Sequence, residues 1–211
     1  MTMVRYGLVI DLKRCTGCFG CVMACKAEHH TPPKVFWAKV LRFETGKYPV
    51  VNRQPLPVLC MHCKEPACKD VCPTGATKKR EDGIVVIDNK LCVGCRYCVV
   101  ACPYGARYFV EKWKDYFTGQ DEPSSEYAEY ARKKRLEESD RGVVTKCNLC
   151  YERLEKGLRP ACVEACPAEA RTFGDFDDPD SEVSKLIRKR RGFRLKEELG
   201  TEPCVYYLPS R

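Results

Sequence analysis

The sequence predicts an α+β fold in which short strands and short helices flank cysteine-rich loops. One observation is that sixteen of the 17 cysteines fall into four groups of four, which leaves only Cys204 outside a group. The other is that short apolar runs lie directly before or after these groups, as strands would. With 211 residues, the chain is long enough for one domain or two small ones. The groups are Cys15, Cys18, Cys21 and Cys25; Cys60, Cys63, Cys68 and Cys72; Cys92, Cys95, Cys98 and Cys102; and Cys147, Cys150, Cys162 and Cys166.

The spacing within the groups is typical of iron–sulfur ligands. Groups one and three read C-x2-C-x2-C-x3-C, and Pro103 after group three completes the run found in bacterial-type [4Fe–4S] ferredoxins. Group two reads C-x2-C-x4-C-x3-C-Pro, and group four reads C-x2-C-x11-C-x3-C-Pro. Three closely spaced thiolates hold one face of a cubane, whereas the fourth cysteine starts a helix and reaches a different cluster. The sixteen thiolates therefore predict four [4Fe–4S] clusters.

Disulfides and structural zinc are the other interpretations of so many cysteines. Disulfides suit a secreted chain, but three cysteines within seven residues bridge poorly. Zinc sites use C-x2-C pairs, but zinc does not explain the third cysteine, the fourth cysteine and the proline that follows it. A zinc-stabilised interaction module remains the alternative from a different class of function.

A repeated frame follows three of the groups, in which the fourth cysteine is followed by Pro-x-x-Ala. It reads Cys72-Pro-Thr-Gly-Ala76, Cys102-Pro-Tyr-Gly-Ala106 and Cys166-Pro-Ala-Glu-Ala170. We expect strands over residues 6–10, 84–87, 106–110 and 170–173, with Asp11 and Asp88 after the first two. Strand, cysteine loop, short helix and strand form a ferredoxin half-unit. Four half-units predict two bacterial-ferredoxin-like double-cluster modules, interleaved in sequence, with an insertion and a C-terminal extension.

The distances between groups predict which half-units pair. Only 19 residues separate groups two and three, with a hairpin-like turn over 80–83, so these groups should form one module. Groups one and four then form the other. Because each fourth cysteine serves its partner half-unit, the sequence predicts four ligand sets, which we name sites a to d. They are Cys15, Cys18, Cys21 and Cys166 (site a); Cys25, Cys147, Cys150 and Cys162 (site b); Cys60, Cys63, Cys68 and Cys102 (site c); and Cys72, Cys92, Cys95 and Cys98 (site d).

The predicted domains follow from this pairing. Module A comprises 1–50 plus 142–178, module B comprises 51–111, and 112–141 is a charged insertion with a helix over 126–138 that faces solvent or a partner. The remainder, 179–211, should form a helix and a tail. Asp178 and Pro179 are expected to start that helix and Gly192 to end it. The apolar, aromatic tail after Gly192 is expected either to dock a partner or to pack on the chain's own modules.

Charge and motifs exclude several classes of function. The formal net charge is +8, but each oxidised cubane with its thiolates adds about −2, so a nucleic-acid partner is not expected. No dinucleotide-binding or P-loop motif occurs, and no catalytic site is predicted. The sequence has no run of 18 apolar residues, so no membrane span is predicted. The first eleven residues do not resemble a signal peptide. His62 should lie beside a cluster without ligating it, and Cys204 should be a packed thiol.

Further motifs accompany the cysteine groups. They are Tyr6-Gly-Leu-Val-Ile-Asp11, Cys60-Met-His-Cys63, Arg159-Pro-Ala-Cys162, Phe173-Gly-Asp-Phe-Asp-Asp-Pro179, Leu195-Lys-Glu-Glu-Leu-Gly-Thr201 and Tyr206-Tyr-Leu208. With these motifs and the cysteine groups, the chain resembles the four-cluster electron-transfer (beta) subunits of molybdopterin oxidoreductases of the dimethyl-sulfoxide-reductase type. The resemblance covers nearly the whole chain and is closest to the polysulfide, thiosulfate and arsenate reductase branch.

The resemblance implies a non-catalytic subunit that passes electrons between a molybdenum or tungsten catalytic subunit and a membrane quinone subunit or another carrier. It also implies a membrane-associated complex, either cytoplasmic or co-exported with a partner that carries the signal. The alternative with the same chemistry is a subunit of a hydrogenase or of a cytoplasmic formate dehydrogenase.

Overall fold

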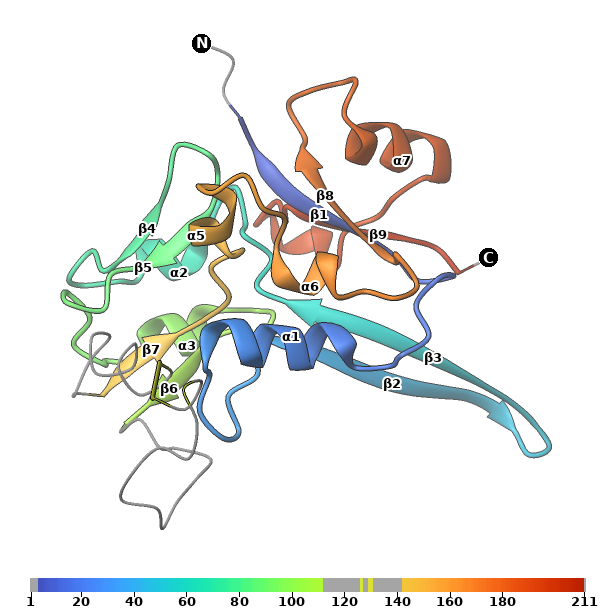
Figure 1. Cartoon of the computed structure of the whole chain (residues 1–211). Helices are drawn as coiled ribbons and strands as arrows, with labels where there is room; N and C mark the ends of the chain where they lie inside the picture. The colour runs from blue at the N-terminus through green and yellow to red at the C-terminus, as the bar shows by residue number, and fades with distance from the viewer. Residues whose placement is uncertain (1–3, 112–125, 127–128, 131–141, 211) are drawn as a thin grey trace.

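The computed structural model describes residues 4–111, 126, 129–130 and 142–210 (Figure 1). Small sheets and short helices agree with the predicted α+β class. The strands are β1 (Tyr6–Asp11), β2 (Ala38–Lys47), β3 (Val50–Leu59), β4 (Thr77–Lys79), β5 (Val85–Ile87), β6 (Tyr108–Val110), β7 (Val143–Thr145), β8 (Arg171–Asp175) and β9 (Val205–Leu208). The helices are α1 (Gly20–His29), α2 (Ala67–Asp70), α3 (Tyr97–Ala101), α5 (Tyr151–Leu154), α6 (Ala161–Glu164) and α7 (Glu182–Arg190), with a 3₁₀ turn at Glu197–Leu199.

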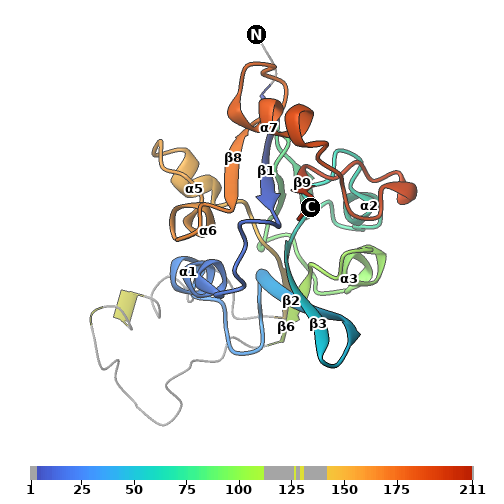
Figure 2. The same ribbon diagram turned by 90° about the vertical axis from the view of Figure 1, so that its right-hand side faces the viewer.

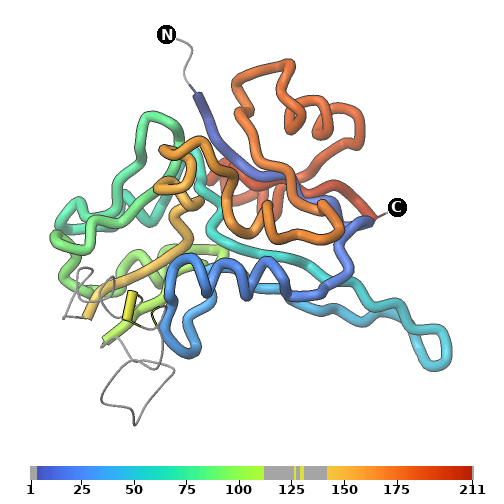
Figure 3. The backbone as a smooth tube through the Cα atoms, in the orientation of Figure 1, coloured from blue at the N-terminus to red at the C-terminus, as the bar shows by residue number. Residues whose placement is uncertain are grey.

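Strands from distant parts of the chain form the three-stranded sheet β8-β1-β9. β1 is antiparallel to β8 and parallel to β9, so the first strand lies between two of the last ones (Figures 1 and 3). Side chains alternate between the two faces of β1. Leu8 and Ile10 join the main core, whereas Val9 packs with Val183 of α7 on the other face. A strand buried on both faces explains the nearly continuous apolar run in its sequence.

The C-terminal tail belongs to this sheet, so the prediction that it docks a partner is wrong. Val205, Tyr207 and Leu208 of β9 are at most 1% exposed, and the Tyr207 hydroxyl donates to the Pro57 carbonyl at 2.9 Å. The Cys204 amide also donates to the Met61 carbonyl at 2.8 Å. The tail therefore packs on the chain's own modules, the alternative that the sequence left open, because its apolar side chains alternate along a strand.

The helix α7 begins three residues later than predicted. Ser181 is its N-cap and accepts a hydrogen bond from the Ser184 amide, so Asp178 and Pro179 lie before the helix. Arg191 follows in the left-handed conformation, and the Gly192 amide donates to the Ile187 carbonyl at 2.9 Å. The helix therefore ends where the sequence predicts. A serine hydroxyl at the start of a helix satisfies an otherwise unpaired amide as well as an aspartate does, which is why the sequence allowed either choice.

A long hairpin of β2 and β3 projects from the body of the molecule (Figures 1 and 3). The sequence did not predict it, and the predicted boundary at 50/51 cuts through it. The boundary at 142 likewise separates β7 from β6, although the two strands pair and Val143 and Val144 pack with Cys92 and Cys98. Strand pairing thus crosses both predicted boundaries and places β7 beside groups two and three.

One core connects the groups. It contains Leu8 and Ile10 of β1, Met61 and Ile84 from the middle of the sequence, and Tyr207 of β9. Figure 2 shows α1, α5 and α6 on one side of the molecule and α2 and α3 on the other. The predicted helix over 126–138 lies outside the described residues except for Glu126, Glu129 and Tyr130, which are helical and exposed. None of the helices in the described part of the chain is both long and apolar enough to cross a membrane.

Candidate metal centres

The four cysteine loops share one backbone feature. In each loop the second residue after the first cysteine has a positive φ: 69° at Gly17, 44° at His62, 68° at Gly94 and 57° at Leu149. This left-handed conformation turns the backbone sharply. The four loops therefore share a turn between their first and second cysteines, although only two of the loops have the glycine that adopts this conformation without strain.

Aspartates hold the start of two loops. Asp11 at the end of β1 accepts from the Lys13 amide at 2.9 Å, and Asp88 accepts from the Lys90 amide at 3.0 Å. The backbone carbonyls of the same two aspartates each accept from the first cysteine of the loop, Cys15 or Cys92, at 3.1 Å. These Asx turns explain why an aspartate follows the strand-like run in both half-units.

Three cavities are each lined by four cysteines, three from one group and one from another. They contain Cys15, Cys18, Cys21 and Cys166; Cys60, Cys63, Cys68 and Cys102; and Cys72, Cys92, Cys95 and Cys98. The fold thus brings together the residues predicted for sites a, c and d.

The residues predicted for site b also lie together, in the interior. Burial raises the pKa of Cys25, and the nearby Cys162 and Cys150 raise it further. Burial likewise raises the pKa of Cys147 well above its usual value, with Cys25 and Cys150 adding to the effect. All four of these cysteines are at most 6% exposed. Cys60 of site c also raises the pKa of Cys147, so sites b and c are neighbours.

The chemistry of these sets fits iron–sulfur clusters. Burial raises the pKa of Cys63 to about 12, with Cys60 adding to it, and burial with Cys162 raises that of Cys150 to about 12. Thiols with so high a pKa lose their proton near neutral pH only when the thiolate binds a cationic centre such as iron. Two buried donors, Nη2 of Arg171 and Nε2 of His62, have no hydrogen-bond partner among the described residues, and the sulfur atoms of a cluster would accept from them. Within the described ranges no three ligating side chains converge on a single-ion site, whereas a cubane needs its thiolates spread around it.

Three buried basic residues near the cysteines were missed by the sequence analysis. Arg107 donates from Nη2 to Cys68 Sγ at 2.9 Å, and Arg171 donates from Nη1 to Cys162 Sγ at 3.6 Å. Lys146 donates from Nζ to the Cys147 carbonyl at 2.7 Å and also to that of Val85. The sequence carried a signal for the two arginines, because each directly follows the alanine of the repeated Cys-Pro-x-x-Ala frame.

His62 and Cys204 are both buried. His62 is 1% exposed, and its Nδ1 accepts from the Val85 amide at 3.1 Å. Burial lowers its pKa well below the usual range, and Lys146 and Arg107 lower it further, so the ring is neutral. Cys204 is buried, and burial raises the pKa of its thiol. His29 was not singled out by the sequence, yet its Nε2 lies 3.1 Å from Cys150 Sγ.

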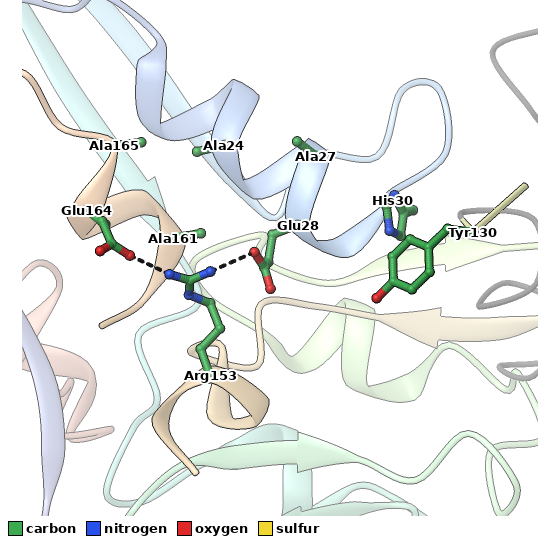
Figure 4. Close-up of a pocket in the computed structure, with 9 residues that line it drawn as sticks. All are labelled: Ala24, Ala27, Glu28, His30, Tyr130, Arg153, Ala161, Glu164 and Ala165. Carbon is green, nitrogen blue, oxygen red and sulfur yellow. Dashed lines mark hydrogen bonds and ion pairs between the residues drawn. The ribbon is translucent and has the colours of Figure 1, made fainter. Parts of the chain in front are cut away.

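A cavity of about 470 Å³ lies between α1 and α6 without a cysteine in its lining (Figure 4). Arg153 forms ion pairs with Glu28 of α1, at 3.0 Å, and with Glu164 of α6. Alanines of α1 and α6, together with His30 and Tyr130, line the rest of the wall. The ion pairs of Arg153 join α1 and α6, the two helices that contain Cys25 and Cys162, which are predicted for site b.

Comparison with known proteins identifies the family. The family described as "4Fe-4S dicluster domain" matches residues 51–118 and 129–176. The chain is 47% identical to a subunit of the selenate reductase of Mesobacillus selenatarsenatis, over 97% of this chain and 72% of the relative. It is 39% identical to the arsenate respiratory reductase iron-sulfur subunit of a Shewanella species, over 98% of this chain and 97% of the relative. It is 37% identical to the menaquinone reductase iron-sulfur cluster-binding subunit of Nitratidesulfovibrio vulgaris, over 99% and 90%.

The chain belongs to this iron–sulfur family. The predicted resemblance to the beta subunits of respiratory molybdopterin reductases is confirmed. So is the prediction of an electron-transfer subunit that does not itself carry the catalytic site. Because the family is one of 4Fe-4S proteins, this chain binds [4Fe–4S] clusters.

Proposed function

We propose that this iron–sulfur subunit holds four [4Fe–4S] clusters at sites a to d and relays electrons between a molybdopterin catalytic subunit and a quinone-reactive membrane subunit. The observation that carries the proposal is the mixed composition of the cysteine-lined cavities, since each takes three cysteines from one group and the fourth from another. Such mixing is the ligation of two-cluster ferredoxins. It also supports two double-cluster modules, with groups one and four in one and groups two and three in the other.

The contacts between sites support a linear order a–b–c–d. Arg171 lies against cysteines of sites a and b, and Arg107 against cysteines of sites c and d. Cys147 and Cys60 link sites b and c. A bound cubane supplies reversible storage of one electron at a potential set by its surroundings. The protein holds the four clusters in a row and excludes water from the sites in the middle of that row.

The exposure of the cysteines supports two ends for entry and exit. Cys18 of site a and Cys95 of site d are exposed, whereas all four cysteines of site b are buried. Electron exchange with a partner falls steeply with distance, so the exposed sites are the ones that partners reach. The relatives named as subunits of a selenate and a menaquinone reductase support one catalytic and one quinone-reactive partner, in a membrane-associated complex.

Metal analysis tests the number of clusters. Anaerobically purified chain should contain about 16 iron and about 16 sulfide, four of each for every cubane. Near 12 iron per chain, or stoichiometric zinc, would contradict the proposal.

Two serine variants and one control test the shared ligation. Cys25→Ser and Cys147→Ser should alter the same electron paramagnetic resonance signal, because both belong to site b. Cys21→Ser, only four residues from Cys25, should alter a different signal. If Cys25→Ser instead matches Cys21→Ser, each group binds its own cluster and the mixed sets are wrong.

A further inference from the structure

Arg107 and Arg171 occupy the same position in two different half-units. Each lies five residues after a fourth cysteine, Cys102 or Cys166, at the end of the frame Cys-Pro-x-x-Ala-Arg. The residue at this position is Thr77 after Cys72 and His30 after Cys25. Each pair of half-units therefore has one arginine at this position. Both arginines are buried, with only 4% of each residue exposed.

Each guanidinium faces cysteines of two neighbouring sites. Arg107 donates to Cys68 Sγ of site c at 2.9 Å and also interacts with Cys98 of site d. Its Nη1 donates to the hydroxyl of Thr77, at 3.0 Å, so the residue in the equivalent position of the partner half-unit orients it.

Arg171 has the corresponding place between sites a and b. Its Nη1 donates to Cys162 Sγ of site b at 3.6 Å, and it interacts with Cys21 and Cys166 of site a. Its buried Nη2 has no hydrogen-bond partner among the described residues.

The cysteines are the anions that balance these charges. Among the ion pairs of the described residues, none joins Arg107 or Arg171 to an aspartate or glutamate. Burial by itself lowers the pKa of Arg171, but the Cys162 and Cys21 thiolates outweigh it and hold that pKa above its usual value. The same balance applies to Arg107, whose pKa Cys68 and Cys60 raise against burial. Both guanidiniums therefore carry a permanent positive charge.

We propose that Arg107 and Arg171 are a matched pair of potential-setting residues, each of which raises the reduction potential of the two clusters on either side of it. One added electron takes a cubane with its thiolates from about −2 to about −3. A fixed positive charge in a poorly polarisable interior stabilises the more negative state. Because it lies between two clusters, it stabilises the reduced state of both.

The proposal rests on the proposed function only in requiring clusters at these sites. It does not depend on which group supplies each fourth cysteine, because Arg107 faces groups two and three and Arg171 faces groups one and four under either ligation.

The test is a potentiometric titration of the full-length chain, followed by electron paramagnetic resonance, in Arg107→Gln and Arg171→Gln. Each variant should lower the midpoints of two clusters and leave the other two unchanged. At a fixed potential, the ratio of reduced to oxidised cluster should fall at least tenfold, which is about 59 mV for one electron.

Two controls separate charge from packing. Arg14→Gln removes an exposed arginine beside Cys15 that pairs with Glu169 at 2.8 Å. Because water screens that charge, the ratio of reduced to oxidised cluster at a fixed potential should stay within a few-fold of the wild-type ratio. Arg107→Lys and Arg171→Lys keep the charge and should retain most of the wild-type potentials.

Iron and sulfide content is measured for every protein. A wild-type chain without clusters would overturn the proposed function, whereas clusters present with unshifted midpoints in the glutamine variants would overturn the potential-setting role alone. A shift confined to one cluster would also overturn it. If the glutamine variants lose iron, the lysine variants decide. If the lysine variants keep their iron and their potentials, the role of charge is supported. If they lose as much iron as the glutamine variants, the arginines only fill space.

Discussion

Groups two and three and groups one and four use the same kind of cysteine loop but close it differently. In the middle half, which we define as groups two and three with β4 and β5, the strands between the groups form a local hairpin around the turn that begins at Arg80. In the outer half, which is groups one and four with β1, β8 and β9, the strands come from opposite ends of the described chain. The same ligand loop therefore forms on strands that are connected in different ways. The loss of stability and of iron when these strands are altered should nevertheless differ between the two halves.

The largest effect is expected from removal of residues 192–211. Val205, Tyr207 and Leu208 together contribute on the order of 5–9 kcal/mol by burial, comparable to the whole stability of about 5–15 kcal/mol of a typical domain. The truncated chain should lose iron from the outer half and unfold at room temperature, as measured by iron analysis and circular dichroism.

A matched control for the truncation shortens the other extended part of the chain. Replacement of residues 45–52, the exposed end of the β2–β3 hairpin, by a two-residue Asn-Gly turn should leave iron content unchanged. Retention of all iron by the truncated chain would show that the outer half does not depend on β9.

Tyr207→Ala should destabilise the chain by about 3–5 kcal/mol, because it removes a fully buried aromatic ring. Tyr207→Phe should cost about 1 kcal/mol, since it loses only the hydrogen bond to Pro57. Anaerobic urea unfolding measures both. Equal costs for the two variants would mean that the hydroxyl, and not the packing of β9, stabilises the outer half.

Gly7→Ala should cost about 1–3 kcal/mol by overpacking. A Cβ at Gly7 would lie 2.3 Å from the Cys204 carbonyl oxygen and 2.2 Å from the Phe176 ring, so β1 and the tail could not approach as they do. The measurement is the urea midpoint. An unchanged midpoint would show that β1 and the tail separate easily, contrary to the burial of the sheet.

Gly83→Ala should have the smallest effect, about 1 kcal/mol. Gly83 has a φ of +82° in the turn between β4 and β5, and the nearest atom to an added Cβ is the flexible Arg5 side chain at 3.2 Å. Hydrogen exchange should report faster opening of β4 and β5 and no change in β1. Faster exchange in β1 as well would show that the two halves open together and would end the contrast between them.

The sequence predicted what depends on local pattern and missed what depends on tertiary contact. Apolar runs beside the cysteine groups marked β1, β5, β6 and β8, since such runs report buried strands. The hairpin β2–β3 gave no such signal, because most of it is exposed and its second strand contains Pro55 and Pro57. β9 was read as an irregular tail because prolines flank its four residues, and only its pairing with β1 makes it a strand.

The candidate site divides in the same way. Cysteine spacing was enough to propose the ligand sets. The expectation that each fourth cysteine starts a helix is wrong, because Cys25 lies inside α1, and Cys72, Cys102 and Cys166 follow the last residues of α2, α3 and α6. The repeated frame marks the positions of Arg107 and Arg171, but only the structure shows that their side chains point inward rather than to solvent.

The pairing of β1 with β8 has a consequence for how the protein is made. A ribosome adds about 5–20 residues per second, so β1 waits on the order of ten to thirty seconds for the strand it pairs with. The middle half forms its β4–β5 hairpin locally and is complete once β7 follows, before β8 is made. During the longer interval the thiols of group one are exposed to oxidants and to the wrong metals, so the outer half is the part that needs protection until β8 arrives.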